Sequence, residues 1–160
     1  MRKAYILVVD DNKITTKLMR KYLESHGFEA TEAYDGIDAL EKIAQRTPDA
    51  IVLDVMMPRM DGYETVRQLR DKAETKNIPV VIVTALNDVP TQIKAIETGA
   101  DDFLSKPVEE KLLIAKAKLL SNLSIKQEQI NFLFKVCENI KSSALPVSEI
   151  DNTITSSELF

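Results

Sequence analysis

Short apolar runs alternate along this chain with longer stretches in which apolar residues recur every three or four positions. Five of the short runs have the composition of β-strands, at residues 5–9, 28–34, 51–53, 80–84 and 102–105. The runs at 51–53 and 80–84 are almost entirely apolar, which is typical of strands buried on both faces. Residues 28–34 alternate between apolar and polar, which indicates a less buried edge strand.

The first helical stretch follows Asn12, whose side chain is suited to cap a helix N-terminus, and it ends at Gly27. Apolar residues recur in it at intervals of four, with two more beside them. The positions that we expect on its packed face are Ile14, Leu18, Met19, Tyr22 and Leu23.

The same spacing predicts four more helices. They run from Gly36 to near Thr47, from Gly62 to about Lys76, around Ile93 and Ile96, and from near Val108 onward. Strands that alternate with helices predict an α/β fold, in which a doubly wound parallel sheet of about 105–125 residues carries helices on both faces. Periodicity alone leaves the strand order open.

Composition then excludes several classes of protein. The apolar fraction of 44% in 160 residues supports a proper core, and no run approaches the ~20 apolar residues of a membrane span. The net charge of −4 argues against a nucleic-acid surface, which normally requires a basic stripe. The apolar run near the N-terminus is short and ends in two aspartates, unlike a signal peptide. A single cysteine, Cys137, fits a reducing compartment, so we expect a cytoplasmic protein.

Polar side chains follow four of the predicted strands at the point where each strand ends. They are Asp10 and Asp11 after the first strand, Asp54 after the third, Thr84 at the end of the fourth and Lys106 after the fifth. In a parallel sheet these ends meet at one edge, where sites in open α/β folds lie. A lone Asp54 is equally well explained as a loop cap, and the whole set as a surface rim with a Lys–Asp ion pair. The repeated placement after apolar strands favours a site.

The chemistry of these groups is complementary. Three carboxylates in one cleft repel each other unless a cation lies among them, and few oxygen ligands favour Mg²⁺. A carboxylate beside Mg²⁺ can attack phosphorus and form an aspartyl phosphate. The metal and Lys106 are then placed to neutralise two phosphoryl oxygens, and the Thr84 hydroxyl can donate a hydrogen bond to another.

Four motifs make the chain resemble the receiver domain of bacterial two-component response regulators (CheY-like). The motifs are V-V-D-D-N at 8–12, L-D-V-M-M-P-R-M-D-G at 53–62, I-P-V-V-I-V-T-A at 78–85 and G-A-D-D-F-L-S-K-P at 99–107, and the resemblance covers about residues 3–122. It implies a flavodoxin-like sheet of order 2-1-3-4-5. It also implies a signalling phosphoacceptor rather than an enzyme, in which Asp54 receives its phosphoryl group from a sensor histidine kinase or a phosphotransfer protein.

The resemblance also implies roles for single residues. Mg²⁺ is expected to be held by Asp11, Asp54 and the main-chain carbonyl of Met56, with Asp10 acting through water. On phosphorylation, Thr84 is expected to move toward the phosphoryl group while Phe103 rotates, and the face of helix 4, strand 5 and helix 5 changes shape. Lys106 is expected to contact the phosphoryl group, and the Lys106–Pro107 peptide bond is expected to be cis.

Met56 and Leu86 stand at two positions that vary across this family and bear on phosphate lifetime. Neither side chain carries a carboxylate or an amide that could orient an attacking water. We therefore expect slow self-dephosphorylation.

The chain continues beyond the resemblance. Apolar residues at 119, 123, 130, 133, 137 and 140 follow a 3-4 spacing that Lys126 interrupts. One interpretation ends the fifth helix near Ser121 and folds a separate helix, about 127–142, back on the domain. The other is one extended helix that pairs two chains into a homodimer or joins the receiver to another part. We expect a receiver domain at 1–122, a helical extension at 123–141 and a tail or linker at 142–160. In this family such extensions often lead into an output domain.

Two other functions share parts of this pattern. A Mg²⁺-dependent phosphohydrolase also uses an Asp nucleophile at a strand end, but it commonly needs a second acid two residues later, where this chain has Met56. A flavin-binding module has the same architecture, but its first loop must cradle phosphate, and here that loop is D-D-N-K.

Overall fold

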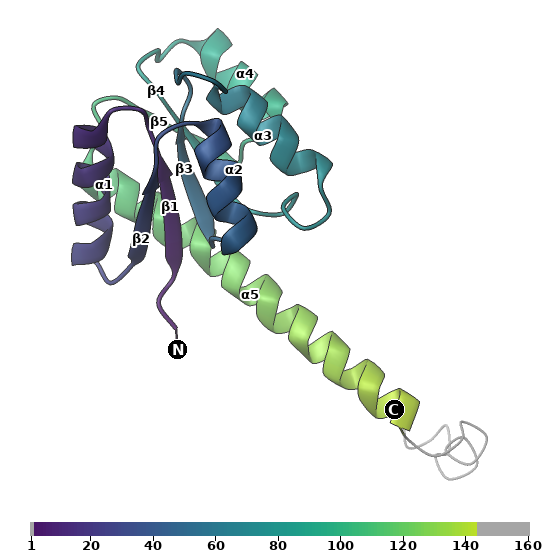
Figure 1. The fold of residues 1–160 in the computed structure, drawn as a ribbon. Helices are drawn as coiled ribbons and strands as arrows, with labels where there is room; N and C mark the ends of the chain where they lie inside the picture. The colour runs from purple at the N-terminus through teal and green to yellow at the C-terminus, as the bar shows by residue number, and fades with distance from the viewer. Residues whose placement is uncertain (1, 144–160) are drawn as a thin grey trace. The chain divides into compact units, whose positions relative to one another are not determined.

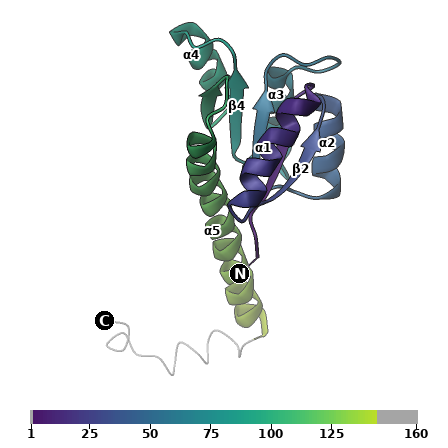
Figure 2. The same ribbon diagram turned by 90° about the vertical axis from the view of Figure 1, so that its left-hand side faces the viewer.

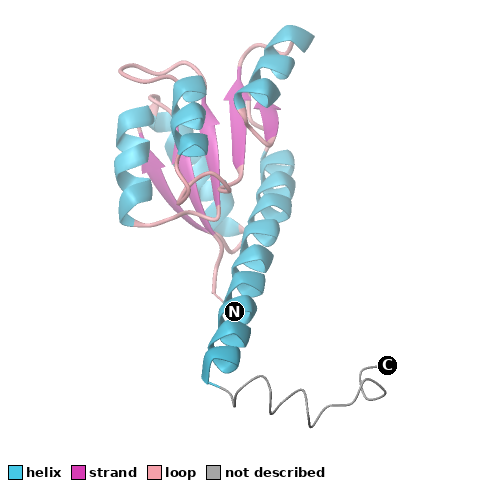
Figure 3. Cartoon of the chain, turned by 90° about the vertical axis from the view of Figure 1, so that its right-hand side faces the viewer, coloured by secondary structure: helices cyan, strands magenta, loops and turns pink. Residues whose placement is uncertain are grey.

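The apolar runs form one parallel five-stranded sheet in the computed structural model, which describes residues 2–143. The strands lie in the order β2-β1-β3-β4-β5, which confirms the expected doubly wound topology, and their arrowheads share one direction in Figure 3. Their bounds are β1 Tyr5–Val9, β2 Glu29–Ala33, β3 Ala50–Asp54, β4 Val80–Thr84 and β5 Asp102–Ser105.

The register brings the carboxyl ends of the strands into line. Val9 of β1 pairs with Leu53 of β3, Asp54 pairs with Val83 of β4, and Thr84 pairs with Ser105 of β5. The residues that directly follow β1 and β5 therefore lie at the same edge as Asp54 and Thr84. The sheet thus presents the end of each strand to one common rim.

Helices cover both faces of this sheet (Figures 1 and 2). Their bounds are α1 Lys13–Ser25, α2 Gly36–Gln45, α3 Gly62–Asp71, α4 Val89–Thr98 and α5 Glu110–Ser143. Alternate strand residues point into two separate cores, as the pleat of a strand requires. Leu7 and Val9 pack with α2, α3 and α4, whereas Ile6 and Val8 pack with α1 and the first part of α5.

The packed face of α1 differs from the one that the spacing predicted. Met19 and Leu23 of α1 are buried as expected, but Leu18 is exposed and Ile14 is 79% exposed. The predicted apolar face of α1 was therefore too wide, because only the part centred on Met19 and Leu23 meets the sheet.

α3 ends at Asp71, earlier than the predicted end near Lys76. The Arg70 guanidinium donates hydrogen bonds to the main-chain carbonyls of Lys76 and Ile78, at 2.9 and 2.7 Å. These bonds hold the following residues in a turn that leads into β4, so the helix cannot continue.

α5 is a single helix over Glu110–Ser143, without the break near Ser121 that the folded-back interpretation requires. The compact unit that contains the sheet extends to Ile125, and the described residues 126–143 belong to a second unit. The predicted tail, 142–160, lies outside the described residues from 144 onward.

Within residues 2–143, no helix combines the length and the apolar character that crossing a membrane requires.

Candidate functional site

A cleft of about 310 Å³ opens at the rim where the strands end. It is lined by Asp10, Asp11, Asn12, Asp54, Val55, Met56, Thr84, Ala85 and Lys106. Every predicted site residue except Phe103 and Pro107 therefore lines one cleft. Its position outside the carboxyl ends of the strands is that of ligand sites in open α/β sheets.

Three carboxylates converge in this cleft. Asp10 and Asp54 are almost fully buried, whereas Asp11 is exposed. One oxygen from each of the three lies within 4.8 Å of the others. The main-chain N–H of Asn12 donates to Oδ1 of Asp10 at 2.9 Å, which holds this carboxylate in place. Sequence reasoning assigned Asn12 only a helix cap, which it also provides for α1.

Lys106 is the ion-pair partner of the two buried carboxylates. Its Nζ lies 2.9 Å from Oδ1 of Asp54 and 3.1 Å from Oδ2 of Asp10. Despite that short distance, Oδ2 of Asp10 accepts no well-aligned hydrogen bond within the described residues. One lysine therefore serves two buried anions and leaves a buried oxygen incompletely satisfied, which costs free energy.

The pKa values reflect this imbalance. Burial raises the pKa of Asp54, the hydrogen bond from Lys106 lowers it, and the charges of Asp10 and Asp11 raise it again, so that the pKa lies above its ordinary value. Burial lowers the pKa of Lys106, but its close contacts with the carboxylates of Asp54 and Asp10 outweigh burial and raise the pKa overall. The lysine is thus held in its charged form.

Thr84 ends β4 beside these groups and is buried. Its carbonyl oxygen accepts a hydrogen bond from the Lys106 N–H at 2.8 Å, which ties the loop after β5 to the end of β4. Its hydroxyl oxygen accepts from the Leu86 N–H at 3.1 Å. The hydroxyl therefore acts as an acceptor here and keeps its own proton for donation.

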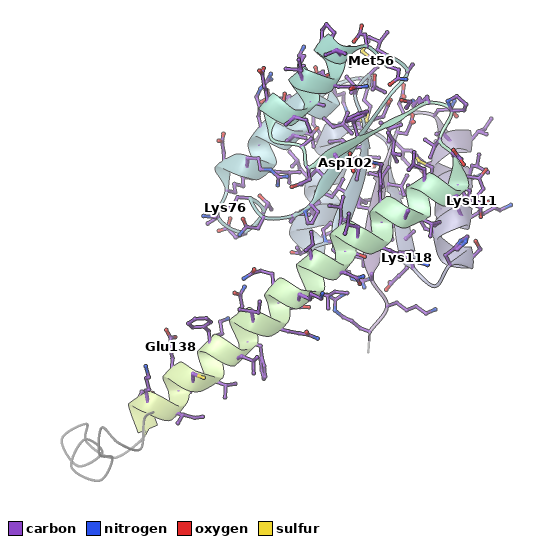
Figure 4. The ribbon with its side chains drawn as sticks, turned by 180° about the vertical axis from the view of Figure 1, so that it is seen from behind. Met56, Lys76, Asp102, Lys111, Lys118 and Glu138 are labelled. Carbon is purple, nitrogen blue, oxygen red and sulfur yellow. The ribbon has the colours of Figure 1, made fainter. Side chains whose placement is uncertain are left out.

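The loop from 55 to 61 carries Met56, whose side chain is 78% exposed at the rim (Figure 4). Gly62 follows this loop and donates its N–H to the Val55 carbonyl at 2.9 Å. A Cβ at Gly62 would lie 2.3 Å from the carbonyl oxygen of Asp54. Glycine is therefore required for the loop to close against the end of β3, a role that the sequence signalled only as a turn.

Phe103 and Pro107 lie in a second hollow, which they line together with Leu112 and Lys116. Phe103 is half-buried, and Nζ of Lys116 lies 6.0 Å from the centre of its ring. The peptide bond that precedes Pro107 is cis. The predicted switch aromatic therefore occupies a different hollow from the carboxylates.

The donor set fits a hard divalent cation. Carboxylate and carbonyl oxygens are the ligands that Mg²⁺ prefers, and the cleft holds three carboxylates together with the loop that carries the Met56 carbonyl. Oδ2 of Asp10 has the ion pair with Lys106 but no aligned hydrogen bond within the described residues, so it can still accept a bond from a further group such as a water molecule on the ion.

Comparisons with known proteins agree with this arrangement. The family model described as the response regulator receiver domain matches residues 6–118. Response regulator PleD of Caulobacter vibrioides is 42% identical over 122 residues, which are 76% of this chain and 27% of that protein. Response regulator MprA of Mycobacterium ulcerans is 43% identical over 115 residues, which are 72% of this chain and 49% of that protein.

Solved structures give the same result. The receiver domain of a Francisella response regulator aligns with a TM-score of 0.72 at 34% identity, over 76% of this chain and 99% of that one. NtrX from Brucella abortus aligns with a TM-score of 0.73 at 30% identity, over 84% of this chain and 31% of that one. The chain spans half or less of the length of the curated relatives that it matches. It belongs to the response regulator receiver domain family of two-component systems.

Proposed function

We propose that this receiver domain accepts a phosphoryl group on Asp54, in a Mg²⁺-dependent reaction, from the phosphohistidine of a sensor histidine kinase or a phosphotransfer protein. The observation that supports this most directly is the pairing of Lys106 with both buried carboxylates at the end of the sheet. This arrangement offers an anionic nucleophile with a fixed cation beside it, as a phosphoryl-accepting carboxylate requires.

The charged residues of the cleft and the Met56 carbonyl have separate roles in this proposal. Asp11, Asp54 and the main-chain carbonyl of Met56 hold Mg²⁺, and Asp10 contributes through water. The bound ion supplies positive charge to the phosphoryl oxygens. A carboxylate oxygen of Asp54 forms the new bond to phosphorus while the phosphorus–nitrogen bond of the phosphohistidine breaks, and the electron pair of that bond stays on the imidazole. Lys106 then balances charge on the phosphoryl oxygens.

Thr84 and Phe103 form the proposed switch. The Thr84 hydroxyl turns toward the phosphoryl group, and Phe103 rotates into the space that Thr84 leaves. The surface formed by α4, β5 and α5 changes with them, as a two-state element biased by a new charged group. That surface then controls a partner protein, dimerisation or an output domain.

We place the chain in the cytoplasm and assign it no nucleic-acid contact.

The helical extension is proposed to pair with a second copy of the chain. In the second unit of α5, Ile130, Leu133, Cys137 and Ile140 are exposed and follow the 3-4 spacing of a coiled-coil seam. Phe132 and other apolar residues beside the seam are exposed as well. Figure 4 shows the side chains of this segment around Glu138. A helix with this much exposed apolar surface is stabilised when that surface is buried against an identical helix.

Incubation with Mg²⁺ and a small acyl phosphate tests the proposed chemistry. We expect one acid-stable, base-labile adduct on Asp54 by mass spectrometry, which is absent in Asp54→Asn and present in Asp71→Asn, a matched change at the exposed end of α3. An adduct at another residue would contradict the proposal. Repeated turnover of a phosphoester would indicate a phosphohydrolase instead, and flavin bound on purification would indicate a flavin module.

A further inference from the structure

The loop between β3 and α3 contains an unusual turn at Pro58, Arg59 and Met60. The Met60 N–H donates to the Pro58 carbonyl at 2.7 Å, and Arg59 between them has a φ of +62°. A three-residue turn with a positive φ at its centre is rare and strained, and a residue other than glycine adopts this φ at a cost. Such a conformation persists only where surrounding contacts enforce it.

Those contacts come from the N-terminus of α2. Nε of Arg59 donates to Oδ2 of Asp35 at 2.7 Å, and the Gly36 N–H donates to the Met60 carbonyl at 3.2 Å. The other carboxylate oxygen of Asp35 accepts from the Asp38 N–H at 2.8 Å and so caps α2. One buried carboxylate therefore joins the start of a helix to the strained turn.

The packing around Gly36 shows how closely the two segments approach. A Cβ at this position would lie 2.2 Å from Oγ1 of Thr65 and 2.7 Å from Cγ of Met60. The backbone of α2 therefore rests directly against the loop and against α3. Burial raises the pKa of Asp35, but its bonds to Arg59 and to the Asp38 N–H outweigh burial and hold the pKa below its ordinary value. The carboxylate is thus kept charged for Arg59.

The far end of the loop is fixed in another way. The Val55 N–H donates to the Val83 carbonyl at 3.3 Å, and the Val55 carbonyl accepts from the Gly62 N–H at 2.9 Å. Met56 and Met57 therefore lie between a segment held by the sheet and a turn held by Asp35. The direction of the Met56 carbonyl depends on both attachments, because a loop held only at the sheet would sample other conformations.

We propose that Asp35 and Arg59 form a positioning pair, which sets the loop so that the main-chain carbonyl of Met56 is ready to bind the divalent cation. The inference rests on the proposed function and extends it to two side chains outside the cleft. Neither residue contacts the ion. Their effect is to increase the fraction of molecules in which the loop is already in the binding conformation, and with it the apparent affinity.

Mg²⁺ binding to metal-free protein, measured by calorimetry, tests this pair in three variants. Asp35→Asn keeps an acceptor for the α2 cap but removes the charge that binds Arg59. Arg59→Gly removes the guanidinium and also relieves the strain at positive φ. We expect each variant to bind Mg²⁺ about five-fold more weakly, and the double variant to bind no more weakly than the single ones, because the two residues act as one unit.

The Arg59→Gly variant distinguishes an effect on the position of the loop from an effect on the stability of the fold. Its free energy of unfolding is expected to stay unchanged or to increase, since glycine adopts this φ without strain, whereas a purely structural role predicts lower stability with unchanged affinity. Hydrogen exchange of the Gly36 amide in metal-free protein, expected to be faster in both variants, gives a readout that needs no metal.

Glu29→Gln is the matched control, because Glu29 pairs with Arg46 at the opposite end of α2, with NH2 of Arg46 2.8 Å from Oε2 of Glu29. We expect its Mg²⁺ affinity to equal that of the wild type. Wild-type affinity in both Asp35→Asn and Arg59→Gly would overturn the positioning role while leaving the proposed function intact. If the wild-type protein binds no Mg²⁺ and forms no adduct on Asp54, the proposed function itself fails, and the positioning role fails with it.

Discussion

Nζ of Lys106 lies 2.9 Å from Oδ1 of Asp54, although Asp54 ends β3, Lys106 follows β5, and β4 lies between these two strands. The lysine therefore reaches across the end of the neighbouring strand. Its backbone is held there by the bond from its N–H to the Thr84 carbonyl. The centre of the cleft is thus an ion pair between groups that meet only because the sheet aligns the ends of its strands.

Removing this lysine is expected to destabilise the metal-free protein. In Lys106→Gln, Asp10 and Asp54 remain buried beside each other without a cation, and we expect a loss of about 2 kcal/mol in the free energy of unfolding. Mg²⁺ is expected to restore part of that loss. Urea denaturation with and without Mg²⁺ measures both effects.

Lys116→Gln is the control for this change, because it breaks the Lys116–Asp102 ion pair of 2.6 Å away from the carboxylate cluster. We expect a loss of at most about 1 kcal/mol there, with no response to Mg²⁺. Equal losses in the two variants would contradict the special role of Lys106.

The pKa of Asp54 predicts how stability changes with pH in the absence of metal. Because the folded-state pKa lies above the ordinary value, the folded protein binds a proton more tightly than the unfolded chain does between the two values. Stability therefore falls as pH rises through this window and stays level above it. Asp54→Asn lacks that fall, so we expect it to be more stable than the wild type at about pH 7 and to lose this advantage toward about pH 4.

Urea denaturation at a series of pH values in the presence of a chelator checks this prediction, with Asp71→Asn as the control. An Asp54→Asn variant that is less stable than the wild type at neutral pH would show that the ion pair with Lys106 outweighs burial and the two neighbouring charges.

Two glycine substitutions distinguish steric crowding beside Asp54 from backbone strain elsewhere in the fold. Gly62→Ala places a methyl group against the Asp54 carbonyl oxygen, and Gly27→Ala meets no atom within 4 Å but has a φ of +87°. We expect each to lose about 1–3 kcal/mol of stability, the first through overpacking and the second through backbone strain. Only Gly62→Ala is expected to slow adduct formation on Asp54 by an acyl phosphate. Equal rates in the two variants would contradict the proposed role of Gly62.

Phosphate on Asp54 is expected to be long-lived. Met56 and Leu86 are both exposed at the cleft or beside it, and neither can orient a water molecule toward phosphorus. Loss of radioactive phosphate from the purified protein measures the lifetime. We expect Met56→Glu to shorten it, whereas Leu18→Glu, which introduces the same charge at an exposed apolar position on α1, leaves it unchanged. A wild-type half-life of seconds would refute the expectation.

The helical extension is expected to dimerise the chain. Leu133→Asp introduces a charge at the seam, and Asn131→Asp introduces the same charge outside it. Light scattering is expected to show a dimer for the wild type and for Asn131→Asp, and a monomer for Leu133→Asp. A parallel pair in register also brings the two Cys137 side chains together, so mild oxidation is expected to link them. A monomeric wild-type chain would refute the pairing.

Much of the fold was predictable because its signals are local. The apolar runs of β3 and β4 read directly as buried strands, and the acids and lysine that follow the strands mark the rim. Asn12 gives the chemical signal for the start of α1 and Gly27 for its end; Asn12 caps the helix, and Gly27, directly after the C-cap residue His26, has a φ of +87°.

The features that were missed depend on contacts between distant segments. The ion pair between Asp35 and Arg59 joins two loops, and no local sequence pattern indicates that these loops are in contact. The early end of α3 follows from hydrogen bonds that Arg70 makes to the next loop. Ile14 looks like a core residue by its spacing, but the orientation of α1 on the sheet is set by which of its apolar residues fit the opposing strands, and Met19 takes that place.

The bond from the Leu86 N–H to the Thr84 hydroxyl oxygen has a consequence for the resting protein. A rotation that turns this hydroxyl toward a group on Asp54 takes the acceptor away from Leu86. Breaking this hydrogen bond costs about 1 kcal/mol. If the two arrangements were otherwise equal in free energy, that cost would keep roughly five-sixths of the molecules in the resting arrangement. In the proposed switch this bond therefore favours the resting arrangement while Asp54 is unmodified, and the rotation of Thr84 frees the Leu86 N–H.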